Sequence, residues 1–258
     1  MKVAILGATG GTGASIVEGL MISPVDLAGP REELARAVHD FNIVISTISA
    51  VNTSDQMLLV DAVKVAGVKR FVPCFFGPVM LLGILGVRDS RYRITGDGNT
   101  PSGYIDLRDV GKWVARIITD PRTLNKKVFA FNIVLTTNQI CDIIERVSGE
   151  TIPRVYITHD EATAAVKRAE EAAPSPNSFQ YFDFVKYQYW NSLVVRGDNT
   201  PAYAEYLGYV DARQLYPDLA TTSFEQYCQQ ALDGQVSGIY TKMVAAAASA
   251  ATASAGQK

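Results

Sequence analysis

Cysteine and histidine are scarce in this chain, with three cysteines and two histidines among 258 residues. Cys74, Cys141 and Cys228 are odd in number and far apart, so they do not form a disulfide framework. Such cysteines are typical of reduced thiols in a reducing compartment, and we therefore expect a cytoplasmic protein. His39 and His159 are isolated in the sequence, so we expect no zinc site or other metal centre.

Charge imbalance and long apolar runs are also lacking. The formal net charge of -2 at pH 7 gives no indication of a nucleic acid or an anionic membrane as a partner. The longest apolar run, near Val79 to Val87, is too short to cross a bilayer. Met1-Lys2 leads directly into an apolar segment, which leaves no room for a signal peptide. Hydrophobic residues make up 48% of the chain, enough for the core of one large α/β domain or two small ones.

The N-terminal segment contains a glycine-rich turn between an apolar run and a helical pattern. Val3–Leu6 has no polar interruption, as expected for a strand buried in a parallel sheet. Glycines follow in a GxxGxxG spacing, and a helical pattern begins at Ala14. Strand, glycine turn and helix together predict a dinucleotide site, and the alternative is a glycine turn that serves packing only. The expected cofactor-binding residues of the turn are Gly7, Ala8, Thr9, Gly10, Gly11, Thr12 and Gly13.

A second buried strand is predicted over Asn42–Ile48. Cofactors lie beyond the carboxyl ends of the strands in an open parallel sheet, so Thr47 and Ile48 join the expected cofactor-binding residues. Asp26 lies roughly twenty residues beyond Gly7, which is the spacing of an acidic ribose ligand. The sequence around Asp26 also fits a later strand and its helix, in which this residue would end the strand or cap the helix.

Apolar periodicity predicts further elements along the chain. We expect a strand that begins at Phe71, strands over 127–131 and 151–158, and helices over 32–39, 53–66, 109–119, 138–148, 159–172 and 223–232. The segment Phe179–Val195 is rich in aromatic residues, which indicates either core packing or the lining of a pocket. Alanine and serine dominate the chain from residue 243 onward, so we expect a disordered tail there.

Several segments, taken together, resemble those of one family. The strings GATGGTG, NIVISTI and AVKVAGVKRFVPCFFGPVM are followed downstream by Gly96–Pro101, Ile105–Gly111 and Arg196–Pro201. This set resembles the NmrA-like branch of atypical short-chain reductases. That branch contains isoflavone reductases, phenylcoumaran reductases and fungal proteins similar to aromatic alcohol reductases.

The resemblance implies an α/β fold with a Rossmann-type parallel sheet flanked by helices and a smaller, mostly helical C-terminal substrate lobe. It implies a Rossmann domain over residues 1–135, a substrate lobe over 136–242 and the tail over 243–258. The implied cofactor is NADP, or else NAD, and the implied partner is a small aromatic molecule or another secondary metabolite. The implied activity is NAD(P)H-dependent reduction. The alternative is a non-catalytic, redox-sensing regulator of the NmrA type or an inactive copy.

The sequence departs from the family pattern at two places. The second Rossmann strand, with the loop that selects the cofactor, is missing between Leu20 and Val25, and a larger piece is missing between about Arg91 and Ile94. In the family this larger piece carries the proposed catalytic lysine, and the stretch 78–93 contains no lysine. Arginine keeps its proton and is a poor general base. Arg91 is therefore either a replacement that binds an anion or a solvated arginine.

The residues of an acid–base pair are not evident either. A Tyr-x-x-x-Lys pair would place both side chains on one helical face, but Tyr92 is followed by Gly96 at that spacing. Tyr104 is followed by Arg108, in a strand-like or turn context. We therefore leave the catalytic residue unknown.

Overall fold

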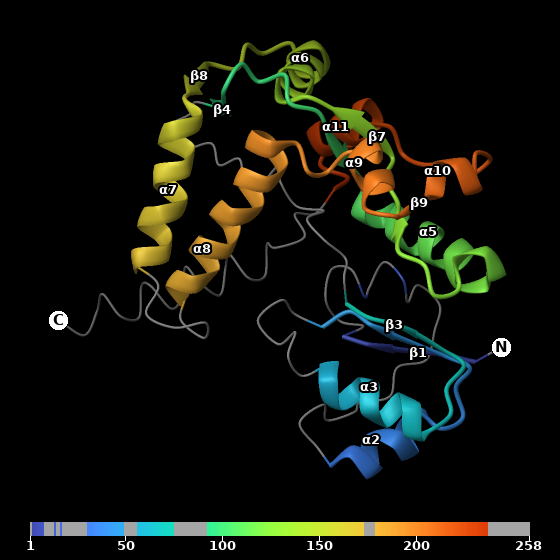
Figure 1. The fold of residues 1–258 in the computed structure, drawn as a ribbon. Helices are drawn as coiled ribbons and strands as arrows, with labels where there is room; N and C mark the ends of the chain where they lie inside the picture. The colour runs from blue at the N-terminus through green and yellow to red at the C-terminus, as the bar shows by residue number, and fades with distance from the viewer. Residues whose placement is uncertain are drawn as a thin grey trace, which may run out of the picture.

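Figure 1 shows the computed structural model, which describes residues 2–7, 13, 16, 30–48, 56–74, 92–172 and 179–236. Its N-terminal part is built on three short parallel strands, β1 (Val3–Leu6), β2 (Ile43–Ser46) and β3 (Arg70–Val72). They are hydrogen-bonded in the order β1-β2-β3, and the register places Leu6 beside Ser46. The three strands therefore end together at one edge of the sheet.

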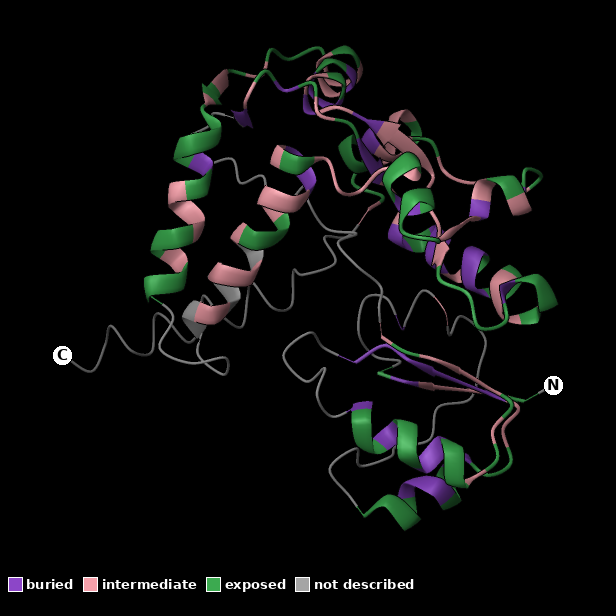
Figure 2. Ribbon diagram, in the orientation of Figure 1, coloured by how far each residue is buried: buried purple, intermediate pink, exposed green. Residues whose placement is uncertain are grey.

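Helices from different parts of the chain cover the two faces of this sheet (Figure 1). Side chains alternate between faces along a strand. Val44 therefore packs against α2 (Arg31–Val38) and α3 (Gln56–Val65), whereas Ile45 packs against α5 (Leu107–Thr119). Figure 2 shows buried and exposed residues alternating along α2 and α3, as expected for helices with one face on a core. This α/β/α sandwich confirms the predicted fold class.

The rest of the described chain contains three two-stranded sheets. β4 (Tyr92–Thr95) pairs in parallel with β8 (Arg154–Ile157), β5 (Ser102–Tyr104) pairs antiparallel with β7 (Ile133–Leu135), and β6 (Val128–Phe129) pairs in parallel with β9 (Val210–Asp211). The β4–β8 and β6–β9 pairs each join strands from both sides of residue 135. The proposed division into domains at that residue stays a prediction.

The remaining described helices come mainly from the C-terminal half. They are η2 (Pro121–Thr123), α6 (Thr137–Ser148), α7 (His159–Ala172), α8 (Phe179–Trp190), the π-helix η3 (Asn191–Arg196), α9 (Pro201–Tyr206), α10 (Ala212–Leu215) and α11 (Phe224–Leu232). Thr136 and Gln139 form a capping box at the start of α6, and Gly149 ends it with a φ of +74°. Ser223 and Gln226 form the same box at α11, so local sequence determines where both helices begin.

Helix α5 connects the sheet to the C-terminal half. Its Asp106 cap accepts a 2.9 Å hydrogen bond from the backbone N–H of Arg108, which is why the helix begins two residues before the predicted start at 109. One face of α5 packs on the sheet, and Trp113 on the other packs against Ala212 and Tyr216. The helix is therefore buried between two layers.

The predicted helices correspond to α2, α3, α5, α6, α7 and α11, and the predicted strands to β2, β3, β6 and β8. The sequence did not predict β5, β7, α9 or α10, each of which has six residues or fewer. Asp26, Arg91 and the predicted tail over 243–258 lie outside the described residues. Within the described ranges, no helix is both long enough and apolar enough to cross a bilayer.

Candidate functional site

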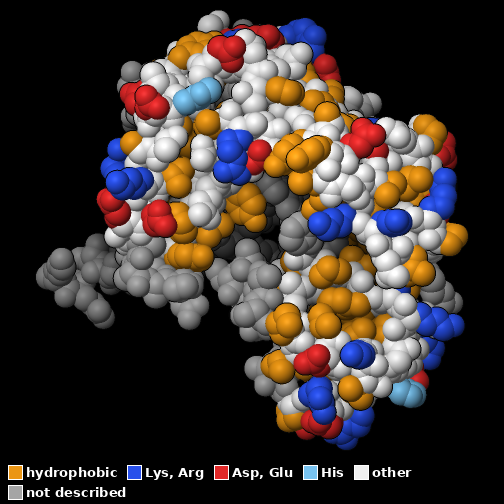
Figure 3. Space-filling model, viewed as in Figure 1, with side chains coloured by type: hydrophobic (Ala, Val, Ile, Leu, Met, Phe, Trp, Pro, Cys, Tyr) orange, Lys and Arg blue, Asp and Glu red, His pale blue; other side chains and the backbone are white. Residues whose placement is uncertain are grey.

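The carboxyl edge of the three-stranded sheet is the candidate site. In Figure 1 the strands run from the side of the N-terminus toward the centre of the molecule. The space-filling view in Figure 3 is hollowed at that centre, between α8 and the part that carries the sheet. Ligands of open parallel sheets bind beyond the carboxyl ends of the strands.

Gly7 follows β1 directly at this edge. Its φ of +82° is a left-handed conformation that favours glycine. A β-carbon built on Gly7 would lie 2.5 Å from the carbonyl oxygen of Thr47 and 3.0 Å from its Oγ1. Any larger residue would push the end of β1 away from the segment that follows β2. The chain therefore needs glycine at the point where the GxxGxxG turn begins.

Thr47 and Ile48 hold the strand ends together. The backbone N–H and the hydroxyl of Thr47 each donate a 2.7 Å hydrogen bond to the carbonyl oxygen of Leu6. The carbonyl oxygen of Ile48 accepts a 3.1 Å hydrogen bond from Sγ of Cys74, which follows β3. Both residues are buried. Their contact with a cofactor stays a prediction, and their observed role is to fix the geometry of the edge.

Two residues that sequence reasoning did not single out complete this edge. Gln56, the first residue of α3, is buried, and its Oε1 accepts a 2.5 Å hydrogen bond from the backbone N–H of Cys74. A polar side chain at the start of an otherwise apolar helix was the signal that could have indicated it. Ser46, at the end of β2, is fully buried, and its hydroxyl has no hydrogen-bond partner.

These observations test whether the edge fits a dinucleotide. Gly7 satisfies both the backbone conformation and the close approach that a phosphate-binding turn requires, and Gly13 is buried in a helical conformation beyond the turn. Ser46 contributes an unused hydroxyl. The described residues therefore fit the predicted group. The predicted residues Ala8, Thr9, Gly10, Gly11 and Thr12 lie outside the described residues.

Tyr104 and Arg108 do not form an acid–base pair. Tyr104 belongs to β5, and burial raises the pKa of its phenol to about 12. Arg108 belongs to α5, where it pairs with Asp106 and donates a 2.7 Å hydrogen bond to Gln230. Because one residue is in a strand and the other in a helix, their spacing does not place them on one helical face. Among the described residues, no group of His, Cys, Asp and Glu could hold a metal ion.

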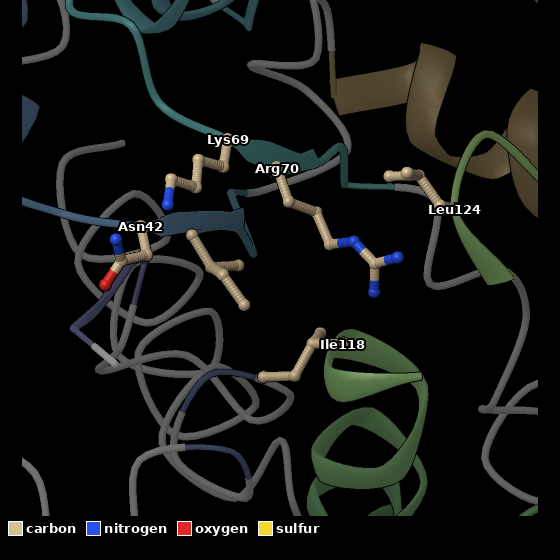
Figure 4. Close-up of a pocket in the computed structure, with 6 residues that line it drawn as sticks. Asn42, Lys69, Arg70, Ile118 and Leu124 are labelled. Atoms are coloured by element: carbon tan, nitrogen blue, oxygen red, sulfur yellow. The ribbon is translucent and has the colours of Figure 1, made fainter. Parts of the chain in front are cut away.

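A depression of about 440 Å³ lies at the opposite, amino edge of the sheet (Figure 4). It is lined by Asn42, Ile43, Lys69, Arg70, Ile118 and Leu124. Arg70 donates hydrogen bonds of 2.8 Å and 3.2 Å to the carbonyl oxygens of Ile117 and Asp120 at the C-terminus of α5. Cations at that end of a helix satisfy its free carbonyl groups. We therefore assign this depression to helix capping and keep the candidate site at the carboxyl edge.

A parallel α/β sheet with a left-handed glycine after its first strand defines the class of Rossmann-type folds. Residues 91–228 of the chain match the NmrA-like family. The chain is 32% identical to the asnovolin J 5',6'-dehydrogenase nvfM of Aspergillus novofumigatus, over 91% of this chain and 96% of that protein. The chain therefore belongs to the NmrA-like family, as the sequence predicted.

Plant reductases are more distant relatives. The chain is 26% identical to the phenylcoumaran benzylic ether reductase Betv6 of Betula pendula, over 77% of this chain and 78% of that protein. The fold is similar to that of the leucoanthocyanidin reductase–NADPH complex from Vitis vinifera, with a TM-score of 0.76, 22% identity and coverage of 90% and 99%. The predicted relationship to isoflavone reductase-like proteins is confirmed, and this structural neighbour holds the cofactor that the resemblance implied.

The alignment with the fungal dehydrogenase extends over 314 positions, more than the 258 residues of the chain. That relative therefore contains internal residues that have no counterpart here. This agrees with the prediction that internal family segments are missing. The places where we expect them, between Leu20 and Val25 and between Arg91 and Ile94, stay predictions.

Proposed function

We propose that the chain is an NADPH-dependent reductase of a small aromatic molecule or another secondary metabolite. The observation that carries the proposal is the close approach of Gly7 to Thr47, because it produces the turn that a diphosphate requires. Membership of the NmrA-like family and the reductases and dehydrogenases among its relatives support it. We also propose that the protein acts in the cytoplasm.

When bound, the reduced nicotinamide would supply a hydride. The chain's own contribution begins with Gly7, which directs the main chain out of the sheet, and with Thr47, which locks the ends of β1 and β2 at a fixed separation. A rigid strand edge lowers the entropy lost when the cofactor and substrate are brought together. The described residues contain no acid–base group that we can assign to protonating the product.

The test is a titration of the full-length chain with NADPH and with NADH, followed by nicotinamide fluorescence. We expect tighter binding of NADPH, and equal weak affinity for both would refute the preference. NADPH oxidation is then measured with a panel of aromatic carbonyl compounds and benzylic ethers. Oxidation with at least one member is the expected result, and failure to bind either dinucleotide would overturn the proposal.

A second candidate is a non-catalytic, dinucleotide-binding regulator of the NmrA type, or an inactive copy. It is favoured by the absence of lysine from the stretch 78–93, where the family places its proposed catalytic lysine. Binding of NADPH without oxidation by any member of the panel would support this candidate over the reductase. Sequencing the transcript across codons 20–25 and 90–94 would show whether the missing segments exist in the natural protein.

A further inference from the structure

Four buried side-chain atoms among the described residues have no hydrogen-bond partner: Ser46 Oγ, Thr95 Oγ1, Trp190 Nε1 and Asn191 Oδ1. The last two belong to consecutive residues at the point where α8 passes into the π-helix η3. Buried polar groups are nearly always hydrogen-bonded, and an unbonded one calls for a physical explanation. Two on adjacent residues therefore point to a partner group that binds there.

The chemistry of the two atoms defines that partner. The indole N–H of Trp190 can only donate a hydrogen bond, and the amide oxygen of Asn191 can only accept one. A hydroxyl group both accepts and donates, so it matches the two requirements. The surroundings are apolar, because Trp190 packs against the core cluster of Ile94, Cys141, Leu193 and Val194. The partner is therefore a hydroxyl group carried on an apolar skeleton.

The segment that carries the pair is held rigidly by the motif Arg196–Pro201, which the sequence analysis singled out without a role. Asp198 accepts hydrogen bonds of 2.9 Å from Ser192 Oγ and 2.7 Å from Arg196 Nε, which closes the end of the π-helix. Asn199 donates a 2.7 Å hydrogen bond to the carbonyl oxygen of Gly103 and accepts one of 2.7 Å from its N–H. π-Helical turns occur frequently at functional sites, and rigid support is what a recognition site needs.

We propose that Trp190 and Asn191 form a recognition subsite for a hydroxyl group on an aromatic or other largely apolar substrate. Trp190 donates to the hydroxyl oxygen, and Asn191 accepts its proton in a hydrogen bond. The proposal rests on the proposed function in that it names a substrate class for the same enzyme. It requires nothing from the dinucleotide itself, so the two can fail separately.

The experiment compares two probes that differ at one group, 4-hydroxycinnamaldehyde and 4-methoxycinnamaldehyde. Each is titrated calorimetrically into the full-length chain, with and without NADP⁺, which cannot reduce them. We expect the wild type to bind the hydroxyl probe about tenfold more tightly. Asn191→Leu should bring the hydroxyl probe down to the level of the methoxy probe, because only the hydroxyl donates. Trp190→Phe should weaken both probes, because both offer an oxygen to the indole N–H.

Thermal unfolding of the free variants is the second measurement, with Trp113→Phe as the matched control. The indole N–H of Trp113 donates a 3.1 Å hydrogen bond to Oδ1 of Asn132, so its loss should lower the unfolding temperature. Trp190→Phe and Asn191→Leu remove atoms that lack a partner and should not lower it.

Three results would overturn the proposal. The first is a wild type that does not prefer the hydroxyl probe, and the second is Asn191→Leu keeping that preference. The third is unfolding of Trp190→Phe and Asn191→Leu at temperatures as low as that of Trp113→Phe, because the two atoms would then have a partner, such as a buried water, in the free protein. Failure to bind NADP⁺ would instead count against the proposed reductase, and the titrations without NADP⁺ would still decide the subsite.

Discussion

The side-chain amide of Asn132 donates a 2.7 Å hydrogen bond to the fully buried carboxylate of Asp109. The same carboxylate accepts a 2.7 Å bond from the backbone N–H of Thr222, and Nζ of Lys112 lies 2.6 Å from its other oxygen. Asn132 in turn accepts the bond from the indole of Trp113. One side chain of α5 therefore connects that helix to the residue before β7 and to the segment that leads into α11.

Replacing Asp109 with Asn should destabilise the protein markedly. The amide lacks the charge that attracts Lys112 and presents a donor to groups that are themselves donors. We expect a loss of about 2–4 kcal/mol in the free energy of unfolding, measured from the urea midpoint. The control is Asp218→Asn, which breaks an exposed ion pair with Arg116 and should cost about 0.5 kcal/mol. Equal losses in the two variants would contradict the role of Asp109.

The same carboxylate should make stability depend on pH. Burial alone would raise the pKa of Asp109, but the hydrogen bonds from Lys112, Thr222 and Asn132 outweigh it and hold the pKa below its usual value. A group with a lowered folded-state pKa stabilises the fold above its unfolded pKa of about 4, and this contribution is lost as the pH falls through the folded value. We therefore expect the stability gap between wild type and Asp109→Asn to narrow from pH 7 to about pH 3. A gap that stays constant would show that Asp109 is not charged in the fold.

Several parts of this fold were predictable because short-range chemistry determines them. The apolar runs of β1 and β2 leave little choice but a buried strand, and the glycine spacing after β1 requires a turn. Thr136 with Gln139 and Ser223 with Gln226 mark the starts of α6 and α11 at the positions observed. Gly7, the one residue of the candidate site that carries its geometry, was predicted from the same local pattern.

The remaining features depend on contacts between distant segments. β5 has only three residues, and its partner β7 lies beyond the whole of α5, so no local pattern indicates it. The hydrogen bond from Cys74 to Ile48 depends on the register of β3 with β2. The unpaired atoms of Trp190 and Asn191 depend on how the π-helix packs. In each case the residue types are visible in the sequence, but their partners are not.

Replacing Gly7 with Ala should impair both folding and cofactor binding. Its β-carbon would meet the Thr47 carbonyl at 2.5 Å in addition to the strain of a positive φ. We expect a loss of about 3 kcal/mol in stability and at least about tenfold weaker NADPH binding.

Gly67→Ala is the matched control for this prediction. Gly67 has a similar φ of +68°, but nothing lies within 4 Å of the place of its β-carbon. It should cost only about 1 kcal/mol and leave NADPH affinity unchanged. If Gly7→Ala behaved like Gly67→Ala in both measurements, the close approach at the strand edge would have no functional role.

The depression at the amino edge should prove to be structural. Arg70→Met removes the side chain that caps α5, so we expect about 2 kcal/mol lower stability with unchanged NADPH affinity. Lys69→Met, at the next position in the same depression, should change stability by no more than about 0.5 kcal/mol. Weaker NADPH binding by the Arg70 variant at unchanged stability would instead assign a ligand to this edge.

The three cysteines should differ in reactivity and so report on the candidate site. Cys141 and Cys228 are buried, and burial raises the pKa of both thiols, whereas Cys74 is only half-buried. Because the thiolate is the reactive form, N-ethylmaleimide should modify Cys74 first in the native protein, as followed by mass spectrometry. Bound NADPH should slow this reaction, since Cys74 bonds to Ile48 at the carboxyl edge. Cys74→Ser keeps a donor for Ile48 and should bind NADPH while taking up no label. Labelling of Cys141 or Cys228 first, or a rate that NADPH leaves unchanged, would place the cofactor elsewhere than at this edge.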